Sequence, residues 1–219
     1  MTLPQQTEPV VYQGHFGEFT INQGDRVGVI IYRAGLMVAA LSFALGSFLV
    51  LWQGTTPVVL QTLTFLYGMF SLSLGVSLVT VHIYLLPLHR LLQIFWLIGT
   101  VAAAAVAWQS SEPLALSVYH RPMALFGVGF IFAALTGIYF KEAFCFNRLE
   151  TKLLTPLVPL LLLGHLAGIL SPAVEQVLLA SYSLLFIVFA LRKAVQPTPP
   201  DIGDKSVFEY LKQQRAAKA

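Results

Sequence analysis

The hydrophobic residues of this chain lie in long unbroken runs. Barrel strands would alternate apolar and polar residues over about ten positions, whereas the stretches LLLLGHLAGIL and VAAAAVAW are continuously apolar. In a helix, roughly 20 apolar residues cross a bilayer core about 30 Å thick. The pattern therefore predicts six membrane-spanning helices, over residues 34–52, 58–86, 91–108, 123–140, 153–170 and 174–191.

These runs divide the chain into three parts. We expect residues 1–33 to form an N-terminal cytoplasmic or interfacial segment, 34–191 a six-helix transmembrane domain, and 192–219 a cytoplasmic tail. Gly14 and Gly17 interrupt short apolar runs in the first part, which predicts a small hairpin there. The tail begins with a proline-rich stretch, expected to be an extended spacer, and ends in a short amphipathic helix. The expected fold is an all-α polytopic membrane protein.

Composition agrees with a chain whose solvent is mostly lipid. Of 219 residues, 57% are hydrophobic and only 11% are charged, and the mean hydropathy is +0.75. Because soluble domains carry about 25% charged residues, this composition excludes an ordinary water-soluble globule. A single cysteine cannot form an internal disulfide.

Lysine and arginine are distributed unevenly among the predicted loops. The N-terminal segment, the second and fourth loops and the C-terminal tail hold twelve of them, while the first, third and fifth loops hold only Arg121. Positively charged loops remain on the cytoplasmic side of a membrane. We therefore expect both termini to face the cytoplasm.

The fourth loop, KEAFCFNRLETK, gathers charge between two apolar runs. Its charges are explained by the need to stay in water and to fix the orientation of the chain. The alternative is an interaction surface, in which apolar residues flanked by charge, together with the second loop, meet a partner. That candidate surface consists of Lys141, Phe144, Cys145, Phe146, Arg148, His89 and Arg90.

Histidines inside the apolar runs are the candidate cofactor ligands. His82 is expected about 6 Å from the inner end of the second helix and His165 about 18 Å from the inner side of the fifth. Ligands of one haem iron must lie at nearly equal depth, so this pair cannot hold a haem. One imidazole suffices for the magnesium of a chlorophyll, and His165 or His82 could supply it. The alternative is a packing role, in which the imidazole forms a hydrogen bond across a helix interface.

Motifs of enzymatic chemistry are missing from the sequence. No zinc dyad, nucleophile elbow or phosphate loop is present. We therefore predict no catalytic residue, no metal site and no enzymatic activity. The basic residues of the tail are too few and too spread to predict nucleic-acid binding.

The stretches YQGHFGEF, IIYRAGL and GIYFKEAFCFNRLETKLLTPLVPLLLLGHL carry a resemblance to a known family. In them the chain resembles a family of uncharacterised integral membrane proteins of cyanobacteria and some plastid-bearing lineages (domain of unknown function 2301). The resemblance covers residues 12–192. It implies a photosynthetic cell and a thylakoid or plasma membrane, and it assigns no role to any residue.

Three functions fit these observations. The first is a non-enzymatic auxiliary or assembly factor of a photosynthetic or respiratory membrane complex, whose partners are the lipid bilayer and that larger complex. The second is a small-molecule carrier or channel with a polar path along Ser71, Ser77, Gln93, Thr136 and Tyr139; a dry, packed centre would argue against it. The third is a pigment- or lipid-handling protein that uses His165 or His82.

Overall fold

Six long helices make up most of the protein. The structure, a computed structural model, describes residues 10–217. The long helices are α1 (Gln23–Gln53), α2 (Pro57–Thr80), α3 (Leu86–Gln109), α5 (Pro122–Phe146), α6 (Leu149–Leu166) and α7 (Pro172–Ala194). Each is long and apolar enough to cross a membrane, so the predicted number of spanning helices is confirmed.

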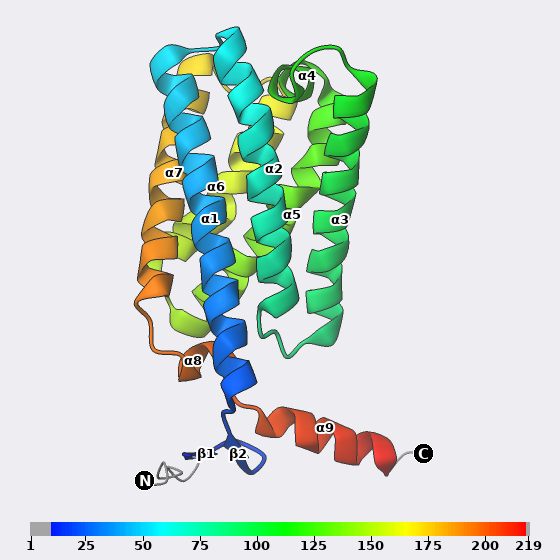
Figure 1. Ribbon diagram of the computed structural model, residues 1–219, viewed down its shortest axis with the longest axis vertical. Coiled ribbons are helices and arrows are strands. Elements are labelled where there is room, and N and C mark those ends of the chain that lie inside the picture. Colours follow the sequence, from blue (N-terminus) through cyan, green and yellow to red (C-terminus); the bar gives the residue numbers. More distant parts are fainter. Residues whose placement is uncertain (1–9, 218–219) are drawn as a thin grey trace, which may run out of the picture.

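Short elements occupy the two ends of the bundle (Figure 1). The strands β1 (Val11–Gln13) and β2 (Glu18–Thr20) form the predicted hairpin, with Tyr12 opposite Phe19. At the same end lie α8 (Pro199–Ile202) and α9 (Ser206–Ala216), so the described chain begins and finishes there. We call this end the tail end. The opposite end, the far end, carries α4 (Leu114–His120).

Local sequence signals set the starts of several helices. Asn22 caps α1 in a capping box with Asp25, which satisfies backbone N–H groups that otherwise lack partners. Thr56 caps α2, and Pro57 follows at a position where its missing N–H is not needed. Asn147 adopts the left-handed conformation (φ 51°) and ends α5, a role that asparagine tolerates better than most residues.

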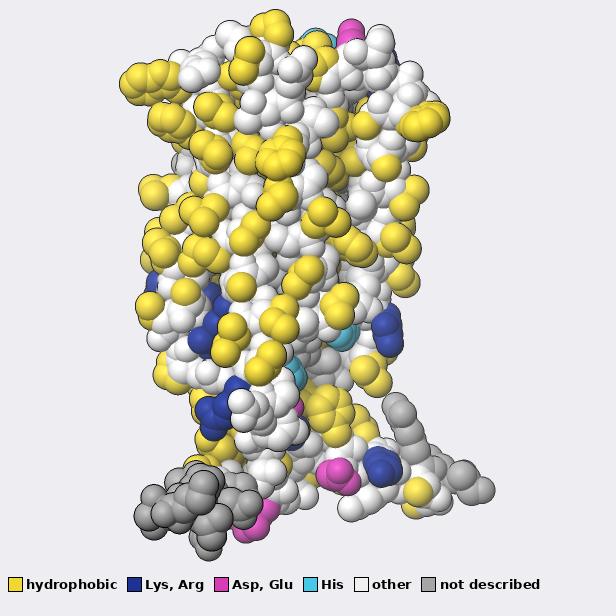
Figure 2. Space-filling view, viewed as in Figure 1, with side chains coloured by type: hydrophobic (Ala, Val, Ile, Leu, Met, Phe, Trp, Pro, Cys, Tyr) yellow, Lys and Arg dark blue, Asp and Glu magenta, His cyan; other side chains and the backbone are white. Residues whose placement is uncertain are grey.

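The long helices pack in a closed ring. Following the contacts around the bundle, α1 meets α2, and then come α3, α5, α6 and α7, which returns to α1. Fully buried side chains fill the centre, among them Leu36, Leu74, Ile131, Tyr139 and Phe186. The flank of the bundle is covered by hydrophobic side chains, while lysine and arginine gather toward the tail end (Figure 2). This surface suits a lipid environment.

The observed elements differ from the predicted ones in several places. Helix α1 begins at Gln23, inside the predicted N-terminal segment, and its 31 residues extend about 46 Å. Helix α2 ends at Thr80, so His82 lies in the α2–α3 connection and not in a spanning helix. Four residues of the proline-rich stretch, Pro199–Ile202, form the helical turn α8, so the stretch is not an extended spacer throughout. Pro199 and Pro200 suit the first turn of a helix, where no N–H donor is required.

Candidate functional site

The segment KEAFCFNRLETK is mostly helical, which corrects its prediction as a loop. Lys141 to Phe146 form the last turns of α5, Asn147 and Arg148 make the turn, and α6 starts at Leu149. The turn is this tight because Asn147 reverses the backbone in a single residue. As a result, several charged side chains of this segment point into the tail end of the bundle.

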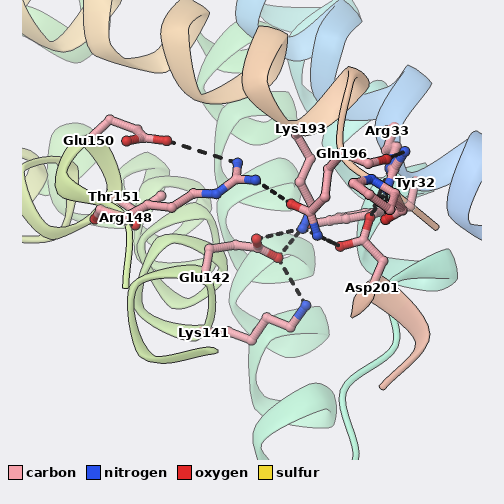
Figure 3. Close-up of polar contacts among 11 residues, drawn as sticks. Tyr32, Arg33, Lys141, Glu142, Arg148, Glu150, Thr151, Lys193, Gln196 and Asp201 are labelled. Carbon is pink, nitrogen blue, oxygen red and sulfur yellow. Dashed lines mark hydrogen bonds and ion pairs between the residues drawn. The ribbon is translucent and has the colours of Figure 1, made fainter. Parts of the chain in front are cut away.

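Lys193, near the end of α7, is the centre of a buried ion network (Figure 3). Its side chain is 0% exposed, as is that of Glu142 on α5. Lys193 Nζ donates to Glu142 Oε2 at 2.5 Å and also to Asp201 Oδ1. Lys141 Nζ donates to the other oxygen of Glu142 at 2.9 Å, and the Tyr32 hydroxyl lies 3.3 Å from that oxygen. Each buried charge therefore has an opposite partner, as the low-dielectric interior requires.

Asp201 joins this network to the first helix. Arg33 Nε and Nη2 both donate to Asp201 Oδ2, at 2.8 and 2.5 Å, and such charge-assisted hydrogen bonds are stronger than neutral ones. Arg33 also donates to the backbone carbonyls of Gln196 and Pro197. The helical turn α8 is what brings Asp201 to this position. The C-terminal tail is thus held by charge to α1 through Arg33 and to α7 through Lys193.

The aromatic ring of Phe146 lies among cations. Lys193 Nζ is 4.4 Å from the ring centroid, and Lys141 and Arg148 are each 5.6 Å away, within the range of cation–π attraction. Arg148 also donates to the side chain of Gln196. The whole network has more cations than carboxylates: Arg33, Lys141, Arg148, Arg192 and Lys193 against Glu142, Glu150 and Asp201.

The predicted interaction surface is therefore divided. Lys141, Phe146 and Arg148 belong to the network described above. Phe144, 85% exposed, and Cys145 face outward from the last turn of α5, and Arg90 is also exposed, on α3.

His89 is occupied within the bundle. Its Nε2 lies 2.6 Å from the carbonyl of Leu78, near the end of α2, and 3.2 Å from the side chain of Gln93. This contact satisfies a carbonyl that the helix end leaves free. Among the predicted surface residues, the outward-facing ones are Phe144, Cys145 and Arg90.

The two tails are fastened to each other. The backbone N–H of His15 donates to Asp204 Oδ2 at 2.6 Å, and that of Phe16 to Ser206 Oγ at 3.1 Å. Hydrogen bonds from the Ser206 hydroxyl and the His15 amide hold the pKa of Asp204 below its usual value. Phe16 stacks on Tyr210 of α9 with ring centroids 4.1 Å apart. We call the hairpin, α8 and α9 together the tail platform.

The α2–α3 connection supports this platform. The hydroxyl of Tyr84 donates to the carbonyl of Ile202, and its ring packs against Phe208 of α9. His82 lies beside Gly28 of α1, and burial lowers the pKa of its imidazole. In the structure, His82 thus packs against α1.

His165 lies at the far end of the bundle. Its Nδ1 is 2.5 Å from Glu175 Oε1 on α7, and its Nε2 is 3.2 Å from the carbonyl of Tyr119 on α4. The Tyr119 hydroxyl donates to the other oxygen of Glu175 at 3.0 Å; partial burial and this carboxylate raise the pKa of the phenol. Both ring nitrogens of His165 have partners, so ligation of a magnesium would have to displace one of them.

The polar residues named for a transport path lie in separate helix interfaces. Ser71 pairs with Thr100 at 2.8 Å, and Ser77 donates to the carbonyl of Tyr32 at 3.0 Å. Thr136 bonds within its own helix, and Tyr139 pairs with Tyr182. Leu74, Leu78, Ile131, Leu135 and Ile138, all 0% exposed, fill the space among them. In the part of the chain that is described, these polar groups do not join into one path.

Sequence reasoning missed the principal members of the network. The sequence pattern places Glu142 in a water-exposed loop and Lys193 and Asp201 in a tail, whereas all three side chains are buried. Lys193 follows directly on the apolar run of α7, which was the one available signal that it could be drawn inside. No group of three or more His, Cys, Asp or Glu side chains within residues 10–217 is arranged to hold a metal ion.

Comparison with curated proteins and with solved structures finds no match. A family model described as "Uncharacterized integral membrane protein (DUF2301)" matches residues 76–210. The match runs from the end of α2 into the first half of α9 and contains Glu142, Lys193 and Asp201. The chain belongs to this family of integral membrane proteins and is a multi-pass protein of the lipid bilayer.

Proposed function

We propose that the protein is a non-enzymatic auxiliary or assembly factor of a larger membrane complex, photosynthetic or respiratory, in a thylakoid or plasma membrane. The observation that carries this proposal is the tail platform. Residues 189 positions apart in sequence, His15 and Asp204, are bonded to each other, and a buried ion network ties the same tail to α1, α5 and α7. Both tails thereby form one fixed surface at one end of the bundle.

In this proposal the tail end faces the cytoplasm or stroma. The surplus of cations over carboxylates in the network favours that side, as positive charge does generally in membrane proteins. The outward-facing Phe144, Cys145 and Arg90 lie at the same end as the platform. Exposed aromatic and arginine side chains are both enriched in protein interfaces.

The packed centre argues against a carrier or channel. A permeation path for polar solutes needs polar groups in sequence across the bundle, whereas the centre is filled by leucine, isoleucine and aromatic side chains. A fixed, charged end suits the presentation of a binding surface. For this reason we prefer the auxiliary or assembly factor to the small-molecule carrier or channel.

The test is co-purification from native membranes in a mild detergent. The tagged wild-type protein should migrate as part of a larger species on a native gel, with partner subunits identified by mass spectrometry. Phe144→Ser combined with Arg90→Glu should release the partner. The matched control is Met123→Ser, which removes an 80% exposed apolar side chain at the far end. This variant should still bind the partner. A solitary protein, or a partner retained by the double variant at the wild-type level, would refute the proposal.

A further inference from the structure

A hollow opens into the bundle at the far end. It has a volume of about 570 Å³ and lies among α1, α2, α4, α5, α6 and α7. Its walls are formed largely by leucines: Leu60, Leu63, Leu125, Leu161, Leu162 and Leu179. Ligand sites in proteins range over about 300–1,000 Å³, so the hollow is of the size that holds a small molecule.

A second cavity continues the first toward the centre of the bundle. It measures about 260 Å³, and the two share Val50, Leu63, Ala115 and Leu179 in their walls. Its lining includes Phe70 and Phe132, whose rings stack with centroids 5.5 Å apart in the buried core. The two cavities are neighbours, both are mostly apolar, and the second is lined by residues nearer the middle of the helices. We call the two cavities together the far-end tunnel.

Polar groups gather in the wider, outer part of this tunnel. Tyr119, His165 and Glu175 are bonded to one another there. His120 and Gln176 also line it, are exposed, and have no hydrogen-bond partner among residues 10–217. Neither cavity is lined by lysine or arginine, and the one carboxylate, Glu175, is already paired with His165.

This lining selects among ligand classes. A polar solute in the inner cavity would find only the hydroxyls of Ser42, Ser47 and Tyr67 as partners, and each hydrogen bond to water that it lost without replacement would cost about 2 kcal/mol or more. An anionic head group would find no lysine or arginine, and a cation would compete with His165 for Glu175. A long apolar chain fits the inner part, and a neutral head that both donates and accepts hydrogen bonds fits the outer part.

We propose that the far-end tunnel binds a single-chain amphiphile with a neutral, hydroxyl-bearing head. The chain occupies the apolar inner part beside Ala115 and Leu179, and the head bonds to His120, Gln176 or the Tyr119–Glu175 pair. An acyl glyceride and a prenyl alcohol share this chemistry. The proposal goes beyond the auxiliary function, since it concerns the opposite end of the molecule and does not depend on any partner.

Photolabelling of the purified full-length protein tests this site. The probe is hexadecanol with a diazirine in mid-chain, and labelled peptides are mapped by mass spectrometry. We expect labels on α4 and on the part of α7 that includes Leu179. Ala115→Phe, which fills the junction of the two cavities, should lower this labelling at least about tenfold. The matched control is Ala105→Phe on the exposed face of α3, which should label like the wild type.

The controls distinguish the outcomes. If Ala115→Phe lowers the thermal midpoint of unfolding, the test uses Leu179→Phe in its place, because this substitution narrows the same junction. Labels confined to lipid-facing residues, or equal labelling in the wild type and both filling variants, would overturn the proposal. A diazirine hexadecane without the hydroxyl should label the tunnel less; equal labelling would overturn the assignment of the head group. Competition by monoolein but not geranylgeraniol identifies a glyceride as the source, and the reverse result identifies a prenyl alcohol.

Discussion

Lys193 is the residue on which most buried charge at the tail end converges. Its ammonium lies between the carboxylates of Glu142 and Asp201 and near the ring of Phe146. Transfer of such groups out of water is costly, and mutual pairing offsets that cost only while every partner is present. The loss of a single charged residue should therefore destabilise the whole network.

Lys193→Met should destabilise the protein by about 3–5 kcal/mol, because two buried carboxylates then lose their shared cation. The measurement is the free energy of unfolding in detergent, followed by denaturant titration. Lys152→Met is the matched control, since Lys152 is exposed and forms no ion pair in the described part of the chain; it should change stability by no more than about 0.5 kcal/mol. Equal effects of the two substitutions would contradict the network's role.

His82 should make stability sensitive to mild acid. Burial lowers its pKa below the ordinary value of 6.5, so the unfolded chain takes up a proton before the folded one. The contribution of His82 is thus fully present above pH 6.5 and is lost as the pH falls through the lowered pKa. Asp25 opposes part of this shift.

The expected result is a smaller loss of thermal midpoint between pH 7.5 and 5.5 in His82→Gln than in the wild type. His120→Gln, an exposed histidine at the far end, serves as the control and should keep the wild-type dependence. Identical pH profiles for the wild type and His82→Gln would show that this imidazole does not contribute.

At the scale of elements, α8 and the α5–α6 turn position the charged side chains of the buried ion network. Pro199 and Pro200 favour a helical first turn, which places Asp201 beside Arg33. Gly203 then ends α8 with φ 72° and ψ −160°, a conformation open essentially to glycine alone. A Cβ atom on Gly203 would lie 2.8 Å from the ring of Tyr84. The course of the tail therefore depends on this one glycine.

Gly203→Ala should free α9 from the α2–α3 connection. The measurement is hydrogen exchange of peptides from residues 203–217 and 11–20, which should become faster. The control is Gly54→Ala: Gly54 has nearly the same backbone angles (φ 67°, ψ −151°) but no atom near the added carbon. It should bring a similar strain of about 1–3 kcal/mol without faster exchange in the tails. Unchanged exchange in Gly203→Ala would refute the role of this close approach.

The spanning helices were predictable because each needs only a long apolar run, which is a local property of the sequence. The hairpin was predictable from Gly14 and Gly17 for the same reason. The ion network was not predictable, because Lys193 pairs with Glu142, which lies 51 residues away in sequence. No local sequence pattern indicates that contact. From the sequence alone, a charged residue at the edge of an apolar run is equally compatible with a solvent-exposed membrane anchor and with a member of a buried ion pair.

At the scale of the whole molecule, the placement of cations predicts how the bundle is inserted. Cys145 is exposed at the tail end, which we expect to face the cytoplasm. In intact cells it should resist a membrane-impermeant maleimide and react once the membrane is opened. Ser111→Cys in a Cys145→Ser background places the thiol at an exposed site in the α3–α4 connection and should react in intact cells. The opposite pattern would reverse the orientation.

The length of α1 has a consequence for access to the tail platform. A bilayer with its headgroups is about 40–45 Å thick, and α1 alone extends about 46 Å from its far-end terminus. Helix α1 is thus about as long as the bilayer with its headgroups is thick, and the hairpin precedes its first turn. In the function proposed above, soluble loops of the partner complex would approach the hairpin and α9 from the water, without first displacing lipid.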